Sequence, residues 1–364
     1  MRSPGGMGFD AMGFILDPNV PPCLPQMDDP ELKEKWMAVL NENDVTAAKK
    51  SRKVKKLVRT GVPVSLRREV WLFLANASVR RRPGLFEQLC KTSQGSKGKR
   101  GKEEAYDTIE KDLHRTLPDH RLFMGDNATG RADLEGILKS YVHFNPMLGY
   151  TQGMGLLAGF ALIQMPAEDA FWLLCAVLRN PQMEEYYSAG MKQLHVDSVV
   201  FGNLLQTMDA ELHARFDEVG LQSIMFTPNW FLPLFTRVLP WTTLVRVWDV
   251  FFYEGPTWML RVALAIVRIL REHLMDRTVC PTAGEMLQLL LHPPPHNLTV
   301  DNVLNCAFSV KLKDGEMRKL SRTASKLVRE KNFLNQSADA RGRASSRRPS
   351  AANASRSTSA PARR

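Results

Sequence analysis

Two oppositely charged side chains in residues 109–118 are spaced so that they can act together. Asp112 and Arg115 are three residues apart, so on a helix the carboxylate lies beside the guanidinium and can hold it in one orientation. Pro118 disfavours helical geometry at Leu117, and the helix is therefore expected to end just past the arginine. The pattern predicts a guanidinium that is held at its base and free to project. The same spacing is also typical of an ordinary surface ion pair.

Gln152 is a second polar side chain of interest, because turn-forming residues surround it in the sequence. Asn145, Pro146, Gly149 and Gly153 surround it and specify a tight backbone path. Residues 156–163, which follow, are almost wholly apolar and must be buried, so Gln152 is expected at the lip of a core helix. A buried or half-buried amide at that place needs hydrogen-bond partners. A cap on the helix that follows is the plain structural alternative.

Helical periodicity defines the elements that must position these groups. Tyr106, Ile109 and Leu113 give the segment before Arg115 a buried stripe, and residues 134–142 repeat at amphipathic helical spacing. Further helices are predicted at 31–40, 65–74, 166–178, 197–208, 230–238, 244–252, 258–270, 300–312 and 317–333. No segment shows convincing strand alternation, so the predicted class is all-α with one large helical domain.

The chain divides into four predicted parts. Residues 1–54 are expected to form an irregular N-terminal segment with one short helix, because glycine and proline punctuate the first thirty positions. The main domain is assigned to 55–276, and helices at 277–334 are expected to complete the same lobe. Residues 335–364 form a basic Ser/Arg tail whose composition predicts disorder. Residues 93–102 are expected to be an exposed loop of unassigned role.

Composition limits the class of protein. The net charge of +11 is concentrated in basic runs at 49–59 and 80–102 and in the tail. These runs suit an acidic membrane surface, whereas nucleic acid is disfavoured because the runs lack interleaved aromatic residues. The five cysteines show neither metal-ligand nor disulfide spacing, and the apolar stretch at 154–178 is interrupted by polar residues. We therefore expect a cytoplasmic protein, peripheral on endomembranes, with no integral membrane span.

Several chemistries are excluded by their missing motifs. The sequence has no zinc-ligand spacing, no glycine-rich nucleotide loop with a lysine and no GxSxG elbow. His292 and His296 flank a proline run without other ligands nearby, so no metal site is predicted.

Four motifs together resemble the TBC domain of GTPase-activating proteins for Rab GTPases. They are Arg59-x-Gly61-Val62-Pro63 with Arg67 and Trp71, Ile109-x-x-Asp112-x-x-Arg115, Tyr150-x-Gln152-Gly153-Met154, and Arg246-x-Trp248-Asp249. Each motif is weak alone, but the first three occur in the order typical of the family, and the fourth also resembles it.

The resemblance implies an all-helical domain that accelerates GTP hydrolysis by a bound Rab. Arg115 matches the family's arginine finger and Gln152 its glutamine finger, both supplied in trans. Such a protein is a catalytic activator and no enzyme in its own right; it needs no cofactor or metal, because magnesium and GTP come with the GTPase. A trans arginine finger is typically worth ~10³ to 10⁵ in rate.

The resemblance also implies roles for the remaining motif residues. Asp112 would orient Arg115, with Ile109, Tyr150 and Gly153 in support. Scaffold or partner contacts are assigned to Arg59, Gly61, Pro63, Arg67, Trp71, Trp248 and Asp249. Arg67 and Trp71, four residues apart, are expected either to stack or simply to pack along the helix. The alternative function is a non-catalytic scaffold of the same fold that binds a small GTPase or another trafficking partner.

Overall fold

Helices are the main secondary structure of the described residues. The computed structural model describes residues 8–16, 22–23, 27–95, 99–125 and 128–346 of the 364-residue protein. Within these residues no strand occurs, only two isolated antiparallel bridges near the N-terminus. The α-helices are α1 (Pro30–Glu42), α2 (Val45–Lys50), α3 (Arg52–Thr60), α4 (Arg67–Leu74), α5 (Leu85–Gln94), α6 (Glu103–Leu113), α7 (Thr129–Phe144), α8 (Met154–Gln164), α9 (Ala167–Arg179), α10 (Pro181–Tyr187), α11 (Lys192–Met208), α12 (Ala210–Val219), α13 (Thr227–Phe231), α14 (Trp241–Glu254), α15 (Thr257–Ile269), α16 (Arg271–Met275), α17 (Ala283–Leu291), α18 (Val300–Ser309) and α19 (Asp314–Ser346).

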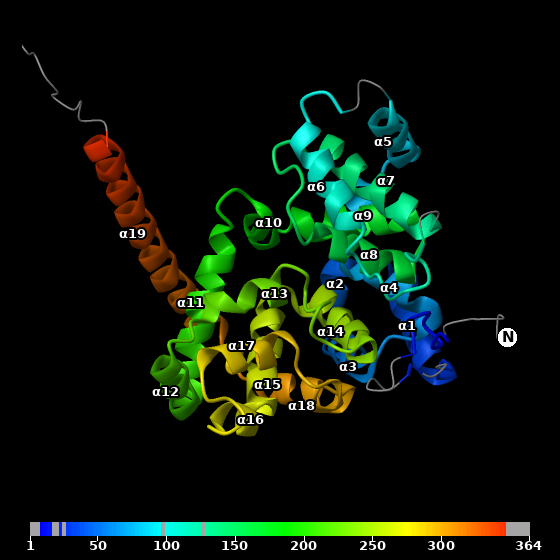
Figure 1. Cartoon of the computed structure of the whole chain (residues 1–364). Coiled ribbons are helices and arrows are strands. Elements are labelled where there is room, and N and C mark those ends of the chain that lie inside the picture. The colour runs from blue at the N-terminus through cyan, green and yellow to red at the C-terminus, as the bar shows by residue number, and fades with distance from the viewer. Residues whose placement is uncertain (1–7, 17–21, 24–26, 96–98, 126–127, 347–364) are drawn as a thin grey trace, which may run out of the picture.

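One continuous apolar core joins the two ends of the described chain, from Trp36 to Val328. In Figure 1, α5 to α9 gather in one half of the molecule and α11 to α18 in the other, while α19 projects away from the body. α8 packs between α7 and α9, and α15 packs against α14 and α18. The predicted all-α class and the predicted burial of α8 are thus confirmed. Both α8 and α15 are apolar nearly all round, which is why they lie inside.

The N-terminal part contains more regular structure than the predicted single helix. Three helices, α1 to α3, occupy residues 30–60, and Asp29, Asp44 and Ser51 each accept hydrogen bonds from backbone amides at a helix start. These caps separate short helices that periodicity alone does not resolve.

Three other stretches differ from expectation. The helix predicted at 230–238 is wrong beyond its start, because α13 ends at Phe231 and residues 232–238 form turns in which Leu234 and Phe235 have positive φ. α5 forms where the apolar pattern thins, because its half-buried Leu85, Phe86 and Leu89 pack against the core and the helix contacts α7. α19 continues to Ser346, past the tail boundary predicted at 335, through residues that include the good helix formers alanine and arginine. The rest of the predicted tail, 347–364, and residues 96–98 of the predicted loop lie outside the described residues.

Candidate functional site

Asp112 and Arg115 form the expected pair at the end of α6. Arg115 Nε donates to Asp112 Oδ1 at 2.8 Å, and a second guanidinium nitrogen bonds to the same oxygen. The helix ends at Leu113, so Arg115 lies in the turn just beyond it. The Asp112 side chain is 7% exposed and that of Arg115 is 48% exposed. The guanidinium is therefore anchored by a buried carboxylate and remains accessible to another molecule.

The motif that contains Tyr150 and Gln152 contacts the motif that contains Arg115 at the Asp112 carboxylate. The Tyr150 hydroxyl donates to Asp112 Oδ2 at 2.7 Å, so one aspartate binds Arg115 with one oxygen and Tyr150 with the other. Burial, and then the hydrogen bond to Asp112, raise the pKa of Tyr150, which keeps the phenol protonated as a donor. Two segments nearly forty residues apart in the sequence are thereby joined.

Gln152 follows two residues after Tyr150, and its side chain is exposed. Gln152 lies just before the buried helix α8, as expected, but the capping alternative is wrong: Gly153 occupies the N-cap of α8 and that helix start has no side-chain cap. Gly153 has φ +108°, and a Cβ there would lie 3.3 Å from Leu232 Cβ. Glycine is required because the chain turns sharply against a neighbouring segment.

The remaining motifs meet at a second buried aspartate, Asp249 on α14. Trp71 Nε1 donates to Asp249 Oδ1 at 2.7 Å and Arg246 Nη1 donates to Oδ2 at 2.6 Å. Arg67 Nε lies 3.4 Å from Oδ1, and Arg67 also donates to the carbonyl of Val62 at 3.0 Å. The structure records no stacking of Arg67 on Trp71 among the described side chains; both groups instead turn toward Asp249. Asp249 accepts the hydrogen bond of Trp71 and forms an ion pair with Arg67, which explains why both side chains turn toward it.

These motif residues are scaffold. Arg67, Trp71, Trp248 and Asp249 are at most 3% exposed, which leaves them no surface for a partner. Trp248 Nε1 donates to the carbonyl of Leu234 at 3.1 Å. Gly61 accepts a hydrogen bond from Trp36, and Pro63 is the N-cap of a short 3-10 helix before α4. Arg59 is exposed, and its guanidinium lies 4.5 Å from the centre of the Phe308 ring.

Comparison with known proteins decides the family. The family model of the Rab-GTPase-TBC domain matches residues 64–275, more than half of the chain. The chain belongs to the Rab-GTPase-TBC domain family. The predicted resemblance is thus confirmed, and both Arg115 and Gln152 lie within the matched range.

Relatives and solved TBC domains agree with this assignment. The chain is 35% identical to mouse (Mus musculus) TBC1 domain family member 10B over 236 residues, which cover 64% of this chain and 29% of that protein. It is 32% identical to mouse Carabin over 295 residues, covering 80% of this chain and 65% of Carabin. This chain thus spans less than two thirds of either relative. The Chlamydomonas flagellar RabGAP TBC domain matches with a TM-score of 0.61 and 25% identity, covering 83% of this chain and 99% of that one. The Ypt/Rab-GAP domain of Gyp1p has the same TM-score at 19% identity, covering 76% and 96%, and shows the fold alone.

A third segment of the TBC domain contributes to the site and was missed by sequence reasoning. Leu232 packs against Gly153, and Leu234 and Phe235 adopt positive φ values of 45° and 65°. Arg237 lies at the surface near Arg115; partial desolvation of its guanidinium, and then the positive charge of Arg115, lower the pKa of Arg237. Residues 232–237 carry no local motif, so only the tertiary structure could reveal this second arginine.

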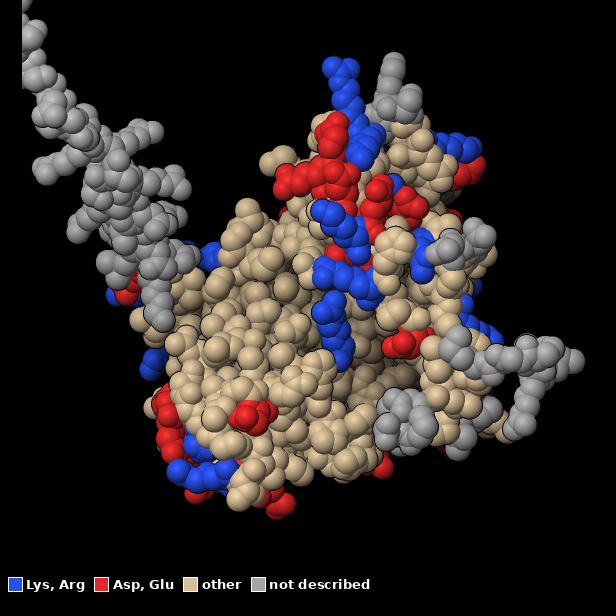
Figure 2. Space-filling view, viewed as in Figure 1, with Lys and Arg blue, Asp and Glu red and all other residues tan. Residues whose placement is uncertain are grey.

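Charge on the surface of the TBC domain is uneven. Figure 2 shows basic side chains in a narrow column down the middle of one face, with acidic side chains beside its upper part and a wide uncharged area below. On α3, Val54, Leu57 and Val58 are buried while Arg52, Lys53, Lys55, Lys56 and Arg59 face outward. The predicted attraction of such basic segments to an acidic membrane stays a prediction. None of the helices in the described ranges combines the length and apolarity that a membrane span requires.

Replacing Tyr150 with phenylalanine is expected to weaken the TBC domain at the shared carboxylate. The change leaves Asp112 Oδ2 without its donor in a buried place, which should lower the free energy of unfolding by about 1 to 3 kcal/mol. Urea unfolding measures this, with Tyr253→Phe as control because the Tyr253 hydroxyl donates only to the backbone carbonyl of Ser51. Equal stability of Tyr150→Phe and wild type would contradict a structural role for this bond.

Proposed function

We propose that the protein accelerates GTP hydrolysis by a Rab-family GTPase through two residues supplied in trans, Arg115 and Gln152. The observation that carries the proposal is the Tyr150 to Asp112 hydrogen bond, because Asp112 anchors Arg115 and Gln152 follows Tyr150 by two residues. Both proposed fingers are exposed at this junction. In this proposal both side chains reach the same partner nucleotide.

The two groups have complementary chemical tasks in this proposal. Negative charge shifts toward the leaving oxygen as the bond to the γ-phosphate breaks, and the Arg115 guanidinium stabilises that charge more strongly in the transition state than in the ground state. The Gln152 amide accepts a hydrogen bond from the attacking water and donates one to the γ-phosphate, which orients the nucleophile without titration. Magnesium and GTP arrive with the partner, so the chain supplies no cofactor or metal of its own.

A hydrolysis screen tests the function and identifies the partner. The purified chain of residues 1–364 is mixed with a panel of GTP-loaded Rab proteins, and phosphate release is followed in single turnover. We expect strong acceleration of at least one member. Failure to accelerate any member of a broad panel would overturn the proposal.

Gln152→Ala is expected to lower the maximal rate on the responsive Rab roughly 100-fold, in the range found for removal of one preorganised transition-state donor. Binding to the Rab loaded with a non-hydrolysable GTP analogue should remain. Gln206→Ala, an exposed glutamine on α11, is the control and should retain full activity. A Gln152→Ala protein as active as this control would exclude the glutamine finger.

The alternative is a non-catalytic scaffold of the same fold. The presence of both exposed side chains favours catalysis over this alternative. A pull-down of the GTPase that is unaffected by its nucleotide state, without any gain in hydrolysis, would favour the scaffold.

A further inference from the structure

The N-terminal segment 8–16 lies against the loop that carries Arg115. We call residues 8–16 the strap and residues 114–121 the arginine loop. The strap is outside the residues that match the family, 64–275. It therefore adds contacts to the arginine loop that the matched domain does not contain.

Three polar contacts fasten the strap to the far end of the arginine loop. Ile15 N donates to the carbonyl of Asp119 at 2.9 Å, and Arg121 N donates to the carbonyl of Gly13 at 2.8 Å. His120 Nδ1 accepts from the amide of Leu122 at 3.1 Å, so Nε2 carries the proton and donates to the carbonyl of Met12 at 2.8 Å. Burial lowers the pKa of His120, which favours this neutral form.

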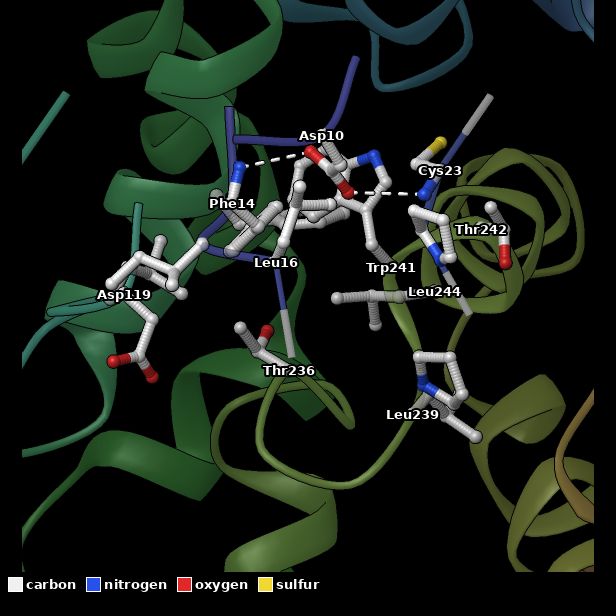
Figure 3. A pocket seen from close by; sticks show the side chains of 15 residues that line it. Asp10, Phe14, Leu16, Cys23, Asp119, Thr236, Leu239, Trp241, Thr242 and Leu244 are labelled. Carbon is white, nitrogen blue, oxygen red and sulfur yellow. Dashed lines mark hydrogen bonds between the residues drawn. The ribbon is translucent and has the colours of Figure 1, made fainter. Parts of the chain in front are cut away.

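The strap also has a rigid shape of its own and an aromatic anchor. The Asp10 carboxylate accepts from the amides of Met12 and Phe14, both at 2.9 Å, and from the amide of Cys23 at 3.1 Å. The Phe14 ring lies 4.7 Å from the His120 ring and 5.0 Å from that of Trp241 at the start of α14. Figure 3 shows Phe14 beside Trp241, with Asp10 bonded to the backbone of Phe14 and Cys23. The segment therefore contacts the arginine loop as a hydrogen-bonded turn.

The arginine loop needs such support. Leu117 has φ +48°, a backbone conformation that costs a non-glycine residue about 1 to 3 kcal/mol and persists only where the surroundings impose it. A cavity of about 530 Å³ adjoins Leu117 and Asp119 and separates them from residues 236–244 (Figure 3). On that side the body of the domain does not fill the space beneath the loop. The strap thus supplies support where packing is incomplete.

We propose that the strap is a positioning element for Arg115. By fixing residues 119–121 it restricts the arginine loop and holds the guanidinium ready for the partner's nucleotide. The proposal rests on the proposed function for its effect on hydrolysis. It concerns the maximal rate, because the strap acts on the loop and needs no contact with the GTPase.

Two substitutions in the chain of residues 1–364 undock the strap by different means. Gly13 has φ +95°, and a Cβ there would lie 2.9 Å from Arg121 Nε and 3.0 Å from His120 Nε2, so Gly13→Ala strains the docked turn. Phe14→Ala removes the aromatic anchor, and Phe14→Tyr keeps the ring as the conservative rescue. Met27→Ala is the matched control in the same part of the chain, since the Met27 side chain is 97% exposed.

Hydrogen exchange of the isolated chain, without any GTPase, tests whether the strap restrains the arginine loop. Peptides covering residues 114–123 include the Arg121 amide, whose acceptor is Gly13. We expect about tenfold faster exchange there in Gly13→Ala and Phe14→Ala, and wild-type exchange in Phe14→Tyr and Met27→Ala. Unchanged exchange in Gly13→Ala and Phe14→Ala would overturn the proposal that the strap holds the arginine loop.

Single-turnover hydrolysis on a responsive GTPase tests the positioning. Rates are normalised to the binding-competent fraction, so partial unfolding does not imitate a loss of kcat. We expect Gly13→Ala and Phe14→Ala to lower kcat about 10- to 100-fold at unchanged KM, and Phe14→Tyr to restore it. Faster exchange with unchanged kcat, or a change in KM alone, would overturn the proposal. Wild-type protein inactive on every GTPase would overturn the proposed function and the effect on kcat, while exchange would still decide whether the strap holds the loop.

Discussion

Arg115→Ala is expected to reduce Rab GTP hydrolysis at saturation by at least about 1,000-fold, the lower end of what a trans arginine finger contributes. That loss corresponds to about 4 kcal/mol of transition-state stabilisation. The expectation follows from the geometry: the guanidinium is anchored on Asp112 and almost half exposed, so its removal takes away a preoriented positive charge. Single-turnover phosphate release measures the effect.

The structure also provides controls for this substitution. Arg277→Ala removes an arginine whose side chain is 70% exposed and bonded to Glu218, and it should leave hydrolysis unchanged. Binding of the GTPase loaded with a non-hydrolysable analogue should persist in Arg115→Ala. Arg115→Lys retains the charge but loses the planar fork that both anchors to Asp112 and spreads over phosphate oxygens, so we expect it to remain strongly impaired. If the hydrolysis rate with Arg115→Ala were within threefold of the wild-type rate, Arg115 would not be the arginine finger.

The second large effect concerns stability. Asp249→Ala is expected to lower the free energy of unfolding by about 3 to 5 kcal/mol, because it leaves the buried charge of Arg67 without a partner and removes the acceptor of Trp71. Arg246, which also donates to the carbonyl of Arg59 at 2.9 Å, loses its anchor as well. The aspartate thus connects α4 and α14 directly and the end of α3 through Arg246.

Urea unfolding followed by circular dichroism measures this loss. Glu34→Ala, an exposed acid in the middle of α1, is the control and is expected to stay within about 0.5 kcal/mol of wild type. A destabilisation of Asp249→Ala no larger than that of Glu34→Ala would contradict its role as the centre of the scaffold. Any fall in hydrolysis should parallel the fraction unfolded, since Asp249 is fully buried.

Asp112 and Asp249 show which side-chain contacts could be predicted from the sequence alone and which could not. The Asp112 and Arg115 pair lies within one helical turn, so its spacing was enough to predict that the carboxylate holds the guanidinium. Arg67 and Trp71 are similarly close in sequence, and of the two alternatives left open for them, stacking is not observed among the described side chains. Trp71 donates a hydrogen bond to Asp249 and Arg67 forms an ion pair with it, and Asp249 lies about 180 residues away, which no local pattern can indicate.

The sequence by itself determined the all-α class, the buried helices α8 and α15 and the identity of the motif residues, because hydrophobic periodicity and chain-local spacing are properties of neighbours along the chain. The tertiary structure alone decided which motifs meet. It joined Tyr150 to Asp112, exposed Gln152, brought residues 232–237 to the site and set the strap against the arginine loop. The physical reason is that these contacts link segments far apart in the chain, and only the packed core fixes their distances.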